Sequence, residues 1–282
     1  MVNAKEKYRH YKGNIYEVIG VGKHTETMED MVIYKDDSHI WIRPLAMFEE
    51  EIEVDNKKIK RFERIGWYNF VMEKGLFITF EGPDGSGKTT VSSKVCERLL
   101  EEGYNIKYTR EPGGSRIAEK IRDIILDPEN TDMDVRTEAL LYAASRRQHL
   151  IDKILPALNS GTTIISDRFV DSSLAYQGWG REIGIDEVFS INQFAIEDYM
   201  PYKTIFLNVD VEEGLKRIQK GREFLDRLDQ ESLDFHYRVY EGYKKVLDKY
   251  KDRMIIIDAN KDVEEVIEDS YKALKGILDD KG

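Results

Sequence analysis

The stretch from Gly82 to Thr89 constrains the fold of this chain more than any other part of the sequence. It reads GPDGSGKT and matches the phosphate-loop pattern G-x-x-x-x-G-K-[ST] at every position. An apolar run, residues 76–81, precedes the loop, and residues 90–100 carry apolar side chains at helical spacing. A glycine-rich turn with a chance lysine has no need of such flanks, so the order of strand, loop and helix predicts a phosphate-binding site.

The residue types of this loop indicate how it would bind a nucleotide. Glycines have no Cβ atom, so the loop can turn tightly and direct its backbone N–H groups at phosphate oxygens, and the following helix N-terminus adds a partial positive charge. Lys88 is expected to reach the β- and γ-phosphates, and Thr89 to ligate Mg²⁺. The predicted ATP-binding residues are Gly82, Pro83, Asp84, Gly85, Ser86, Gly87, Lys88, Thr89 and Thr90.

The composition narrows the class of protein. With 282 residues, the chain is long enough for two domains at roughly 150 residues per domain. Its 41% apolar and 34% charged residues are typical of a globular protein with a sizeable core. No apolar run approaches the ~18 residues of a membrane span, and residues 1–11 are too polar for a signal peptide, so we expect a cytoplasmic protein with no membrane partner.

The net charge and the cysteine content narrow the class of protein further. The net charge of −11 argues against broad nucleic-acid binding, although local arginines can still bind a phosphate. Cys96 is the one cysteine, which excludes an intrachain disulfide and fits a reducing compartment.

Residues 1–70 predict a small β-rich domain. Short β-prone runs at 15–21, 30–34 and 39–43 are separated by turn residues, which suggests a small barrel or a strongly bent sheet. The stretches YRHYKGN at 8–14, HTET at 24–27 and WIRPLAMF at 41–48 resemble those of a small bacterial domain family of unknown function, so the ligand of this domain stays open. Three of its histidines lack zinc-type spacing, and we interpret them as structural or surface residues: His10, His24 and His39. Four other side chains fit either a ligand groove or core packing: Tyr8, Tyr11, Trp41 and Arg43.

Residues 71–282 alternate between strand and helix patterns. Besides residues 76–81, the strand candidates are 105–109, 162–166, 204–209 and 254–257. The expected helices lie around 137–160, 186–199, 230–250 and 263–278. Five β-runs joined by helices predict an α/β domain with a mostly parallel sheet covered on both faces, and ligands are expected at the carboxyl ends of its strands.

Two further motifs follow such strand ends. Arg110 precedes a Pro-Gly-Gly turn and can present its guanidinium to an anion. Asp167 and Arg168 follow the next strand candidate, where the carboxylate can hold Mg²⁺ and the arginine can neutralise a phosphate. An Asp-Arg pair is common on surfaces, but its position directly after a predicted buried strand favours a functional role.

Together these motifs resemble those of thymidylate kinases from about residue 76 to the end of the chain. The matching segments are FEGPDGSGKTT at 80–90, TREPGG at 109–114, DRF at 167–169 and AYQG at 175–178. The resemblance implies a P-loop kinase that transfers the γ-phosphoryl group of ATP to dTMP with Mg²⁺, in thymidine nucleotide biosynthesis, and a homodimer. Phe169 departs from the family, which often has Tyr or His there.

The resemblance also implies roles for single residues. Asp84 would meet the sugar 3′-hydroxyl, and Arg110 and Arg168 would bind the acceptor phosphate. Tyr142 would stack on thymine, and Arg146, one helical turn later, would hydrogen-bond the carbonyl edge of the base. Three more side chains would lie beside the sugar or the base: Ser173, Tyr176 and Gln177.

Residues 220–229 resemble the mobile lid of these kinases. The phosphate loop has no arginine, whereas this segment contains Arg222 and Arg227, as in the bacterial type, where lid closure delivers the positive charge. The predicted catalytic residues are Lys88, Arg168, Arg222 and Arg227. A solvated helix end with mixed charges is the alternative, in which Arg227 would pair with Asp226 or Asp229.

Two other functions stay open at this point. One is a kinase for another or a modified deoxynucleoside monophosphate, because the sequence does not shape the base pocket. The other is a nucleotide-sensing regulatory protein whose N-terminal domain binds a partner. Lys88, Asp167 and the lid arginines weigh against a sensor, which has no need of a catalytic lid.

Overall fold

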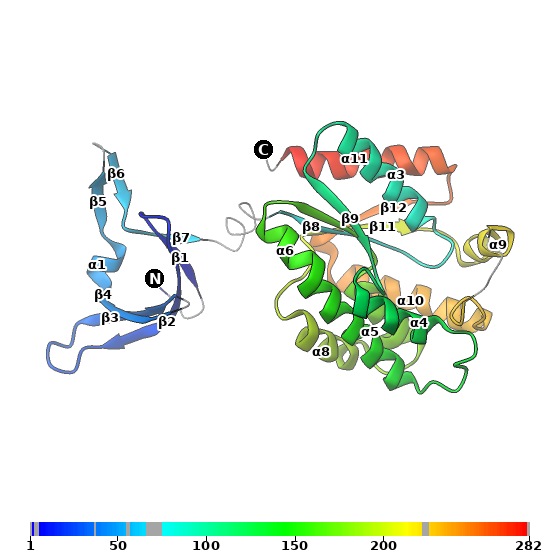
Figure 1. Cartoon of the computed structure of the whole chain (residues 1–282), viewed down its shortest axis with the longest axis horizontal. Helices are drawn as coiled ribbons and strands as arrows, with labels where there is room; N and C mark the ends of the chain where they lie inside the picture. Colours follow the sequence, from blue (N-terminus) through cyan, green and yellow to red (C-terminus); the bar gives the residue numbers. More distant parts are fainter. Residues whose placement is uncertain are drawn as a thin grey trace. The chain divides into compact units, whose positions relative to one another are not determined.

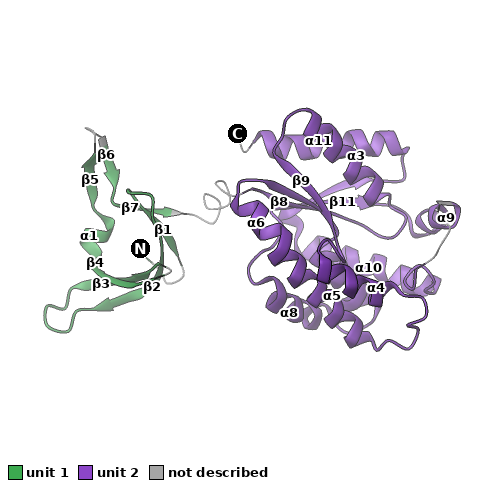
Figure 2. Cartoon of the chain, viewed as in Figure 1, with its two compact units in different colours: residues 1–73 green, residues 74–282 purple. Residues whose placement is uncertain are grey.

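The computed structural model describes residues 2, 6–36, 38–54, 57–65, 75–221 and 226–280. The chain forms two compact units, Met1–Glu73 and Lys74–Gly282, which Figure 2 colours separately. The predicted boundary between residues 70 and 71 lies outside the described residues.

The first unit is β-rich, as predicted. Its five-stranded antiparallel sheet has the order β4-β3-β2-β1-β7, and a two-stranded ribbon pairs β5 with β6. The elements are β1 (Lys7–His10), β2 (Ile15–Lys23), β3 (Asp30–Lys35), β4 (Ile40–Pro44), α1 (Leu45–Glu49), β5 (Glu51–Val54), β6 (Lys57–Lys60) and β7 (Phe62–Ile65).

A small aromatic core holds this unit together. Phe48 of α1 stacks on Phe62 of β7 with ring centroids 4.1 Å apart, and Tyr8 meets Phe48 edge-on. Arg43 lies over the Phe62 ring and Trp41 is exposed. Tyr11 is exposed as well. The three histidines have local neighbours: His10 contacts Phe62, His24 accepts a hydrogen bond from Thr27, and His39 lies beside Asp36.

The second unit contains the predicted parallel sheet. Its strand order is β12-β11-β8-β10-β9, and all four neighbouring pairs are parallel. The strands are β8 (Phe77–Glu81), β9 (Ile106–Arg110), β10 (Thr163–Asp167), β11 (Lys203–Asn208) and β12 (Met254–Asp258). Asp167 is in register with Phe80 on one side and Arg110 on the other. The three predicted motifs therefore end at the same edge of the sheet.

Helices cover both faces of this sheet. Figure 1 shows α3 and α11 on one face and α5, α8 and α10 on the other. The helical segments are α3 (Lys88–Glu101), α4 (Arg116–Leu126), α5 (Val135–His149), η1 (Leu150–Ile154), α6 (Leu155–Asn159), α7 (Val170–Ser173), η2 (Leu174–Gly180), α8 (Ile185–Ile196), α9 (Val211–Gly221), α10 (Leu233–Lys249), η3 (Lys251–Arg253) and α11 (Val263–Asp279). The helix expected around 137–160 starts earlier, because Asp134 caps it by accepting hydrogen bonds from the backbone N–H groups of Arg136 and Thr137.

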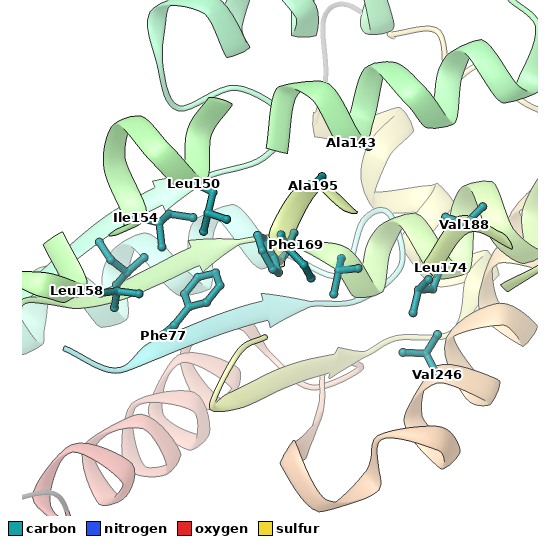
Figure 3. Close-up of a cluster of buried hydrophobic side chains, with 13 residues drawn as sticks. Phe77, Ala143, Leu150, Ile154, Leu158, Phe169, Leu174, Val188, Ala195 and Val246 are labelled. Atoms are coloured by element: carbon teal, nitrogen blue, oxygen red, sulfur yellow. The ribbon is translucent and has the colours of Figure 1, made fainter. Parts of the chain in front are cut away.

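The main core lies between the sheet and the α5–α8 face. Figure 3 shows Phe77 of β8 packed near Phe169 and Leu150, and the two phenylalanine rings meet edge-to-face with centroids 4.8 Å apart. Phe169 is fully buried. This packing anchors the residue directly after Arg168, so the end of β10 has little freedom to move.

Candidate active site

The phosphate loop joins β8 to α3 in the conformation that its glycines allow. Gly85 has φ +74°, and a Cβ atom there would lie 2.0 Å from the carbonyl oxygen of Gly214, so no larger residue fits. Lys88 folds back over the loop and donates hydrogen bonds to the carbonyl oxygens of Gly82 (2.9 Å) and Pro83 (2.8 Å). Burial, with the nearby Arg168 adding to it, lowers the pKa of Lys88 to about 7.

The side-chain oxygens of Thr89 and Asp167 lie in contact, and oxygen is the ligand type that a hard cation prefers. The Thr89 hydroxyl donates to Asp167 Oδ2 at 2.6 Å, and Asp167 Oδ1 is buried without a hydrogen-bond partner among the described residues. Mg²⁺ is commonly held by one or two protein oxygens together with substrate phosphates and water. These two residues fit such a site, although no group of three or more potential metal ligands occurs in the part of the chain that the structure describes.

Arg168 and Asp84 form an ion pair between the end of β10 and the phosphate loop. Arg168 has φ +72°, a strained backbone for a residue with a side chain, and its N–H bonds to the Phe80 carbonyl at 2.9 Å. Its guanidinium donates to Asp84 Oδ1 and to the Tyr176 hydroxyl. Burial would raise the pKa of Asp84, but Arg168 and Lys88 hold that pKa below its ordinary value.

A cavity of about 470 Å³ opens beside these groups. Its size is in the range of small-molecule sites. Twelve predicted residues line it: Asp84, Gly85, Gly87, Lys88, Thr89, Thr90, Arg110, Tyr142, Asp167, Arg168, Tyr176 and Gln177.

Arg146 and Ser173 are predicted substrate-binding residues that do not line this cavity. Arg146 is 2% exposed and is not among the lining residues. Its Nε donates to Glu111 Oε2 at 2.7 Å, one Nη1–H donates to the Ser173 hydroxyl at 3.0 Å, another donates to Asn192, and Nη2 donates to the Phe169 carbonyl at 2.9 Å. The contact of Arg146 with a base therefore stays a prediction.

The two lid arginines differ in what the structure describes. Arg227 is 8% exposed, and it donates to Glu138 Oε2 at 2.7 Å and to the carbonyl oxygen of Ile125 at 2.9 Å. Burial would raise the pKa of Glu138, but Arg181 and other hydrogen-bond donors keep it below its ordinary value. Arg222 lies outside the described residues.

Three charged residues near the cavity were missed by the sequence analysis. Arg122 of α4 lines the cavity and, like Arg110, donates to the Pro112 carbonyl, at 2.9 and 3.1 Å respectively. Glu138 of α5 accepts from the amide of Gln177 at 2.9 Å. Glu81, the last residue of β8, accepts from the Phe169 N–H and the Ser172 hydroxyl. Glu81 directly precedes the phosphate loop, which is a signal that could have singled it out, whereas Arg122 and Glu138 carry no sequence signal beyond helical spacing.

The fold and the site define a class of protein. The parallel sheet carries a phosphate loop, and arginines and a pair of side-chain oxygens suited to a metal ion surround one cavity at its edge. These features define a P-loop kinase that acts on small phosphorylated acceptors. No helix among the described residues is long and apolar enough to cross a membrane.

Comparison with known proteins identifies the family. The thymidylate kinase family model matches residues 80–269, and the model of a family of unknown function, DUF1653, matches residues 6–64. The thymidylate kinase of Geobacillus sp. (strain WCH70) is 58% identical over 194 residues, which cover 68% of this chain and 92% of that protein. The thymidylate kinase of Clostridium novyi (strain NT) is 56% identical over 210 residues, 73% of this chain and 100% of that protein. This chain belongs to the thymidylate kinase family.

A solved structure agrees with this assignment. The crystal structure of thymidylate kinase from Ehrlichia chaffeensis superposes with a TM-score of 0.58 at 33% identity, covering 72% of this chain and 99% of that one. The second unit thus has the length and fold of a whole relative.

Proposed function

We propose that this protein transfers the γ-phosphoryl group of ATP to dTMP with Mg²⁺, giving dTDP and ADP. One observation carries the proposal: the phosphate loop with Lys88 and the Arg168–Asp84 pair line the same cavity of about 470 Å³. A donor triphosphate held at the loop and an acceptor phosphate held by arginine can therefore meet there.

The donor side depends on the loop and the oxygen pair. The loop N–H groups and Lys88 bind the β- and γ-phosphates, so Lys88 exchanges its bonds to the carbonyl oxygens of Gly82 and Pro83 for bonds to phosphate oxygens. Thr89 and Asp167 would hold Mg²⁺, which would supply positive charge to the phosphates of the donor.

The acceptor side depends on side chains at the ends of β9 and β10. Arg110 and Arg168 bind the phosphate of dTMP, and Asp84 accepts a hydrogen bond from the 3′-hydroxyl. Tyr142 covers the base, and Tyr176 and Gln177 contact the sugar and base. Phosphoryl transfer passes through a loose transition state, so positioning and charge neutralisation supply most of the catalysis.

Arg146 has a narrower role in this proposal than its sequence position suggests. Four hydrogen bonds to protein groups use four of the five N–H donors of a guanidinium. One donor is left for a carbonyl oxygen of the base. Ser173 supports Arg146 by accepting one of those four bonds.

Arg222 supplies the transition-state charge when the lid closes. Arg227 is held by Glu138, which also binds Gln177 of the acceptor side. We propose that Arg227 ties the lid to α5, and that its catalytic contribution is indirect.

The assembly, location and domain division of the protein are also proposals. From the family resemblance and the composition, we propose that it is a cytoplasmic homodimer. We further propose that residues 1–70 and 71–282 are separate domains and that the kinase domain binds no nucleic acid. The single cysteine, Cys96, is buried and free, as a reducing compartment permits.

The test is ADP release measured with purified protein across a panel of nucleoside monophosphates. An arginine donor faces the amino group of cytosine donor to donor, so dCMP should be rejected by on the order of 10⁴-fold in kcat/KM, and dUMP, which lacks one methyl group, by about 10- to 200-fold. Phosphorylation of dCMP or a purine monophosphate at a rate similar to that of dTMP would favour the broader-specificity alternative. Nucleotide binding without turnover would favour the sensor.

A further inference from the structure

A second, much smaller cavity also has the phosphate-loop residue Asp84 in its wall. It has a volume of about 10 Å³ and is lined by Pro83, Asp84, Tyr176, Val211, Leu215, His236 and Val239. Asp84 and Tyr176 also line the large cavity. Asp84 therefore belongs to the walls of both cavities, and whatever lies in the small one can influence how Asp84 is presented to the large one.

Two buried polar atoms belong to this small cavity's walls. Asp84 Oδ2 and His236 Nε2 have no hydrogen-bond partner among the described residues. The His236 residue is 6% exposed and the Asp84 side chain 10%. An unsatisfied buried polar atom costs about 1–3 kcal/mol, and such atoms are rare in folded proteins. That two of them share one cavity indicates a common partner.

The cavity is the right size and polarity for one water molecule. A single water needs roughly 10–15 Å³ and two to four polar partners. His236 Nε2–H can donate to the water oxygen, and the water can donate to Asp84 Oδ2. The rest of the wall is mostly aliphatic, with Val211 and Leu215 from α9 and Val239 from α10, and the Tyr176 hydroxyl is a further polar side-chain group of a lining residue.

We propose that His236 is a positioning residue for Asp84 and acts through one bound water in this cavity. Asp84 Oδ1 already accepts a hydrogen bond from Arg168. The water then fixes the second oxygen, so the carboxylate cannot rotate about its last bond. This inference rests on the proposed contact between Asp84 and the 3′-hydroxyl of the acceptor.

His236 would also link α10 to the phosphate loop, two segments that are distant in sequence. It lies in the first turns of α10, which follows the lid segment, and the Ser232 hydroxyl caps that helix by accepting from Phe235 N–H at 3.2 Å. The Phe235 and His236 rings contact each other with centroids 5.8 Å apart. The capped start of α10 thus carries His236 into the wall of the small cavity.

The test uses the 3′-hydroxyl as a probe. For each variant of the full chain, kcat/KM is measured with dTMP and with 3′-deoxy-dTMP, which lacks that hydroxyl, together with KM for ATP. His236→Phe removes the donor and keeps a ring, and it should lower the preference for dTMP about 10-fold or more, mainly through KM for dTMP, with KM for ATP unchanged. His236→Gln keeps an N–H donor and should restore most of the preference. Tyr237→Phe, at the neighbouring exposed position, is the control and should behave as the unmodified protein.

Asp84→Ala, which removes both acceptor oxygens, separates this inference from the proposed function. If Asp84→Ala leaves the preference for dTMP unchanged, the proposed contact of Asp84 with the 3′-hydroxyl is wrong. If Asp84→Ala lowers the preference but His236→Phe does not, the contact holds and the role of His236 is overturned. Should His236→Phe fail to fold, a high-resolution crystal structure of the unmodified protein decides: one water bonded to both atoms supports the inference, and a dry cavity overturns it.

Discussion

The hydroxyl of Thr89 donates a hydrogen bond to Asp167 Oδ2 at 2.6 Å, which joins the first turn of α3 to the end of β10. This contact brings together two residues from motifs 78 positions apart. The other Asp167 oxygen stays without a partner among the described residues, so the pair keeps acceptor capacity for a cation.

Replacing Asp167 by Asn should weaken the use of Mg²⁺. The variant keeps the shape of the side chain but loses its charge, and the concentration of Mg²⁺ that gives half-maximal activity should rise about 10- to 100-fold. Activity is measured against free Mg²⁺ at saturating ATP and dTMP, with the exposed Asp152→Asn as the control. An unchanged Mg²⁺ requirement would remove Asp167 from the metal site.

ATP binding should take up a proton through Lys88. Its pKa of about 7 means that much of the side chain is neutral at pH 8 before ATP binds, and bound phosphates favour the ammonium form. Uptake should approach one proton at pH 8 and should decrease toward pH 6. Calorimetry in buffers with different ionisation enthalpies measures it, and Lys88→Met should abolish it. ATP binding at pH 8 with no proton uptake would contradict the low pKa.

Stability should fall with pH because of Glu81. Burial raises the pKa of Glu81 to about 7 from its ordinary 4.5, and Asp171 adds to the effect. Between these two pH values the Glu81 carboxyl is protonated in the folded protein and ionised in the unfolded chain. The free energy of unfolding therefore decreases as pH rises. The stability that protonated Glu81 contributes is lost completely above about pH 7.

Glu81→Gln isolates this contribution. The free energy of unfolding of the variant relative to the unmodified protein should increase by up to about 3 kcal/mol between pH 4.5 and pH 7. Urea unfolding at several pH values measures the difference, with the exposed Glu97→Gln as the control. Parallel pH profiles for Glu81→Gln and the unmodified protein would rule the effect out.

The two lid arginines should separate into a catalytic and a structural one. Arg222→Ala should lower kcat by about 10³-fold without changing Tm, in line with arginines that neutralise transition-state charge. Arg227→Ala leaves Glu138 with fewer partners in a buried site and should lower the free energy of unfolding by about 3 kcal/mol. Thermal unfolding and steady-state kinetics on both variants check this. The reverse pattern would exchange the two assignments.

A fragment of residues 74–282 should keep most of the kinase activity. The match to the Clostridium novyi thymidylate kinase covers 100% of that protein and 73% of this chain, and the thymidylate kinase family model matches residues 80–269, which lie within the second unit. Steady-state kinetics of the fragment and the full chain are compared after both are shown to be folded. A folded fragment that binds ATP but transfers no phosphate would make the first unit part of the active site.

The sequence predicted the parts of the site that local backbone geometry produces. The phosphate loop is encoded by its own glycines, and the parallel sheet follows from the alternation of apolar runs and helices. Because parallel strands end at one edge, Arg110 and Asp167 could be expected to meet there, and the register of β9 with β10 confirms it. Tyr142 lines the cavity, but Arg146, one turn later on the same helix, does not.

The sequence by itself determined the family, the loop and the strand-end residues, since these depend on short-range patterns. Only the tertiary structure decided which charges are buried and which partners they have. Helical spacing put Arg146 beside Tyr142, but the packing of Glu111, Asn192 and Phe169 around its guanidinium decided its depth. His236 belongs to no motif, and only the folded chain places it in the wall of the same small cavity as Asp84. Desolvation and pairing depend on neighbours from distant segments, and no local pattern in a single sequence records them.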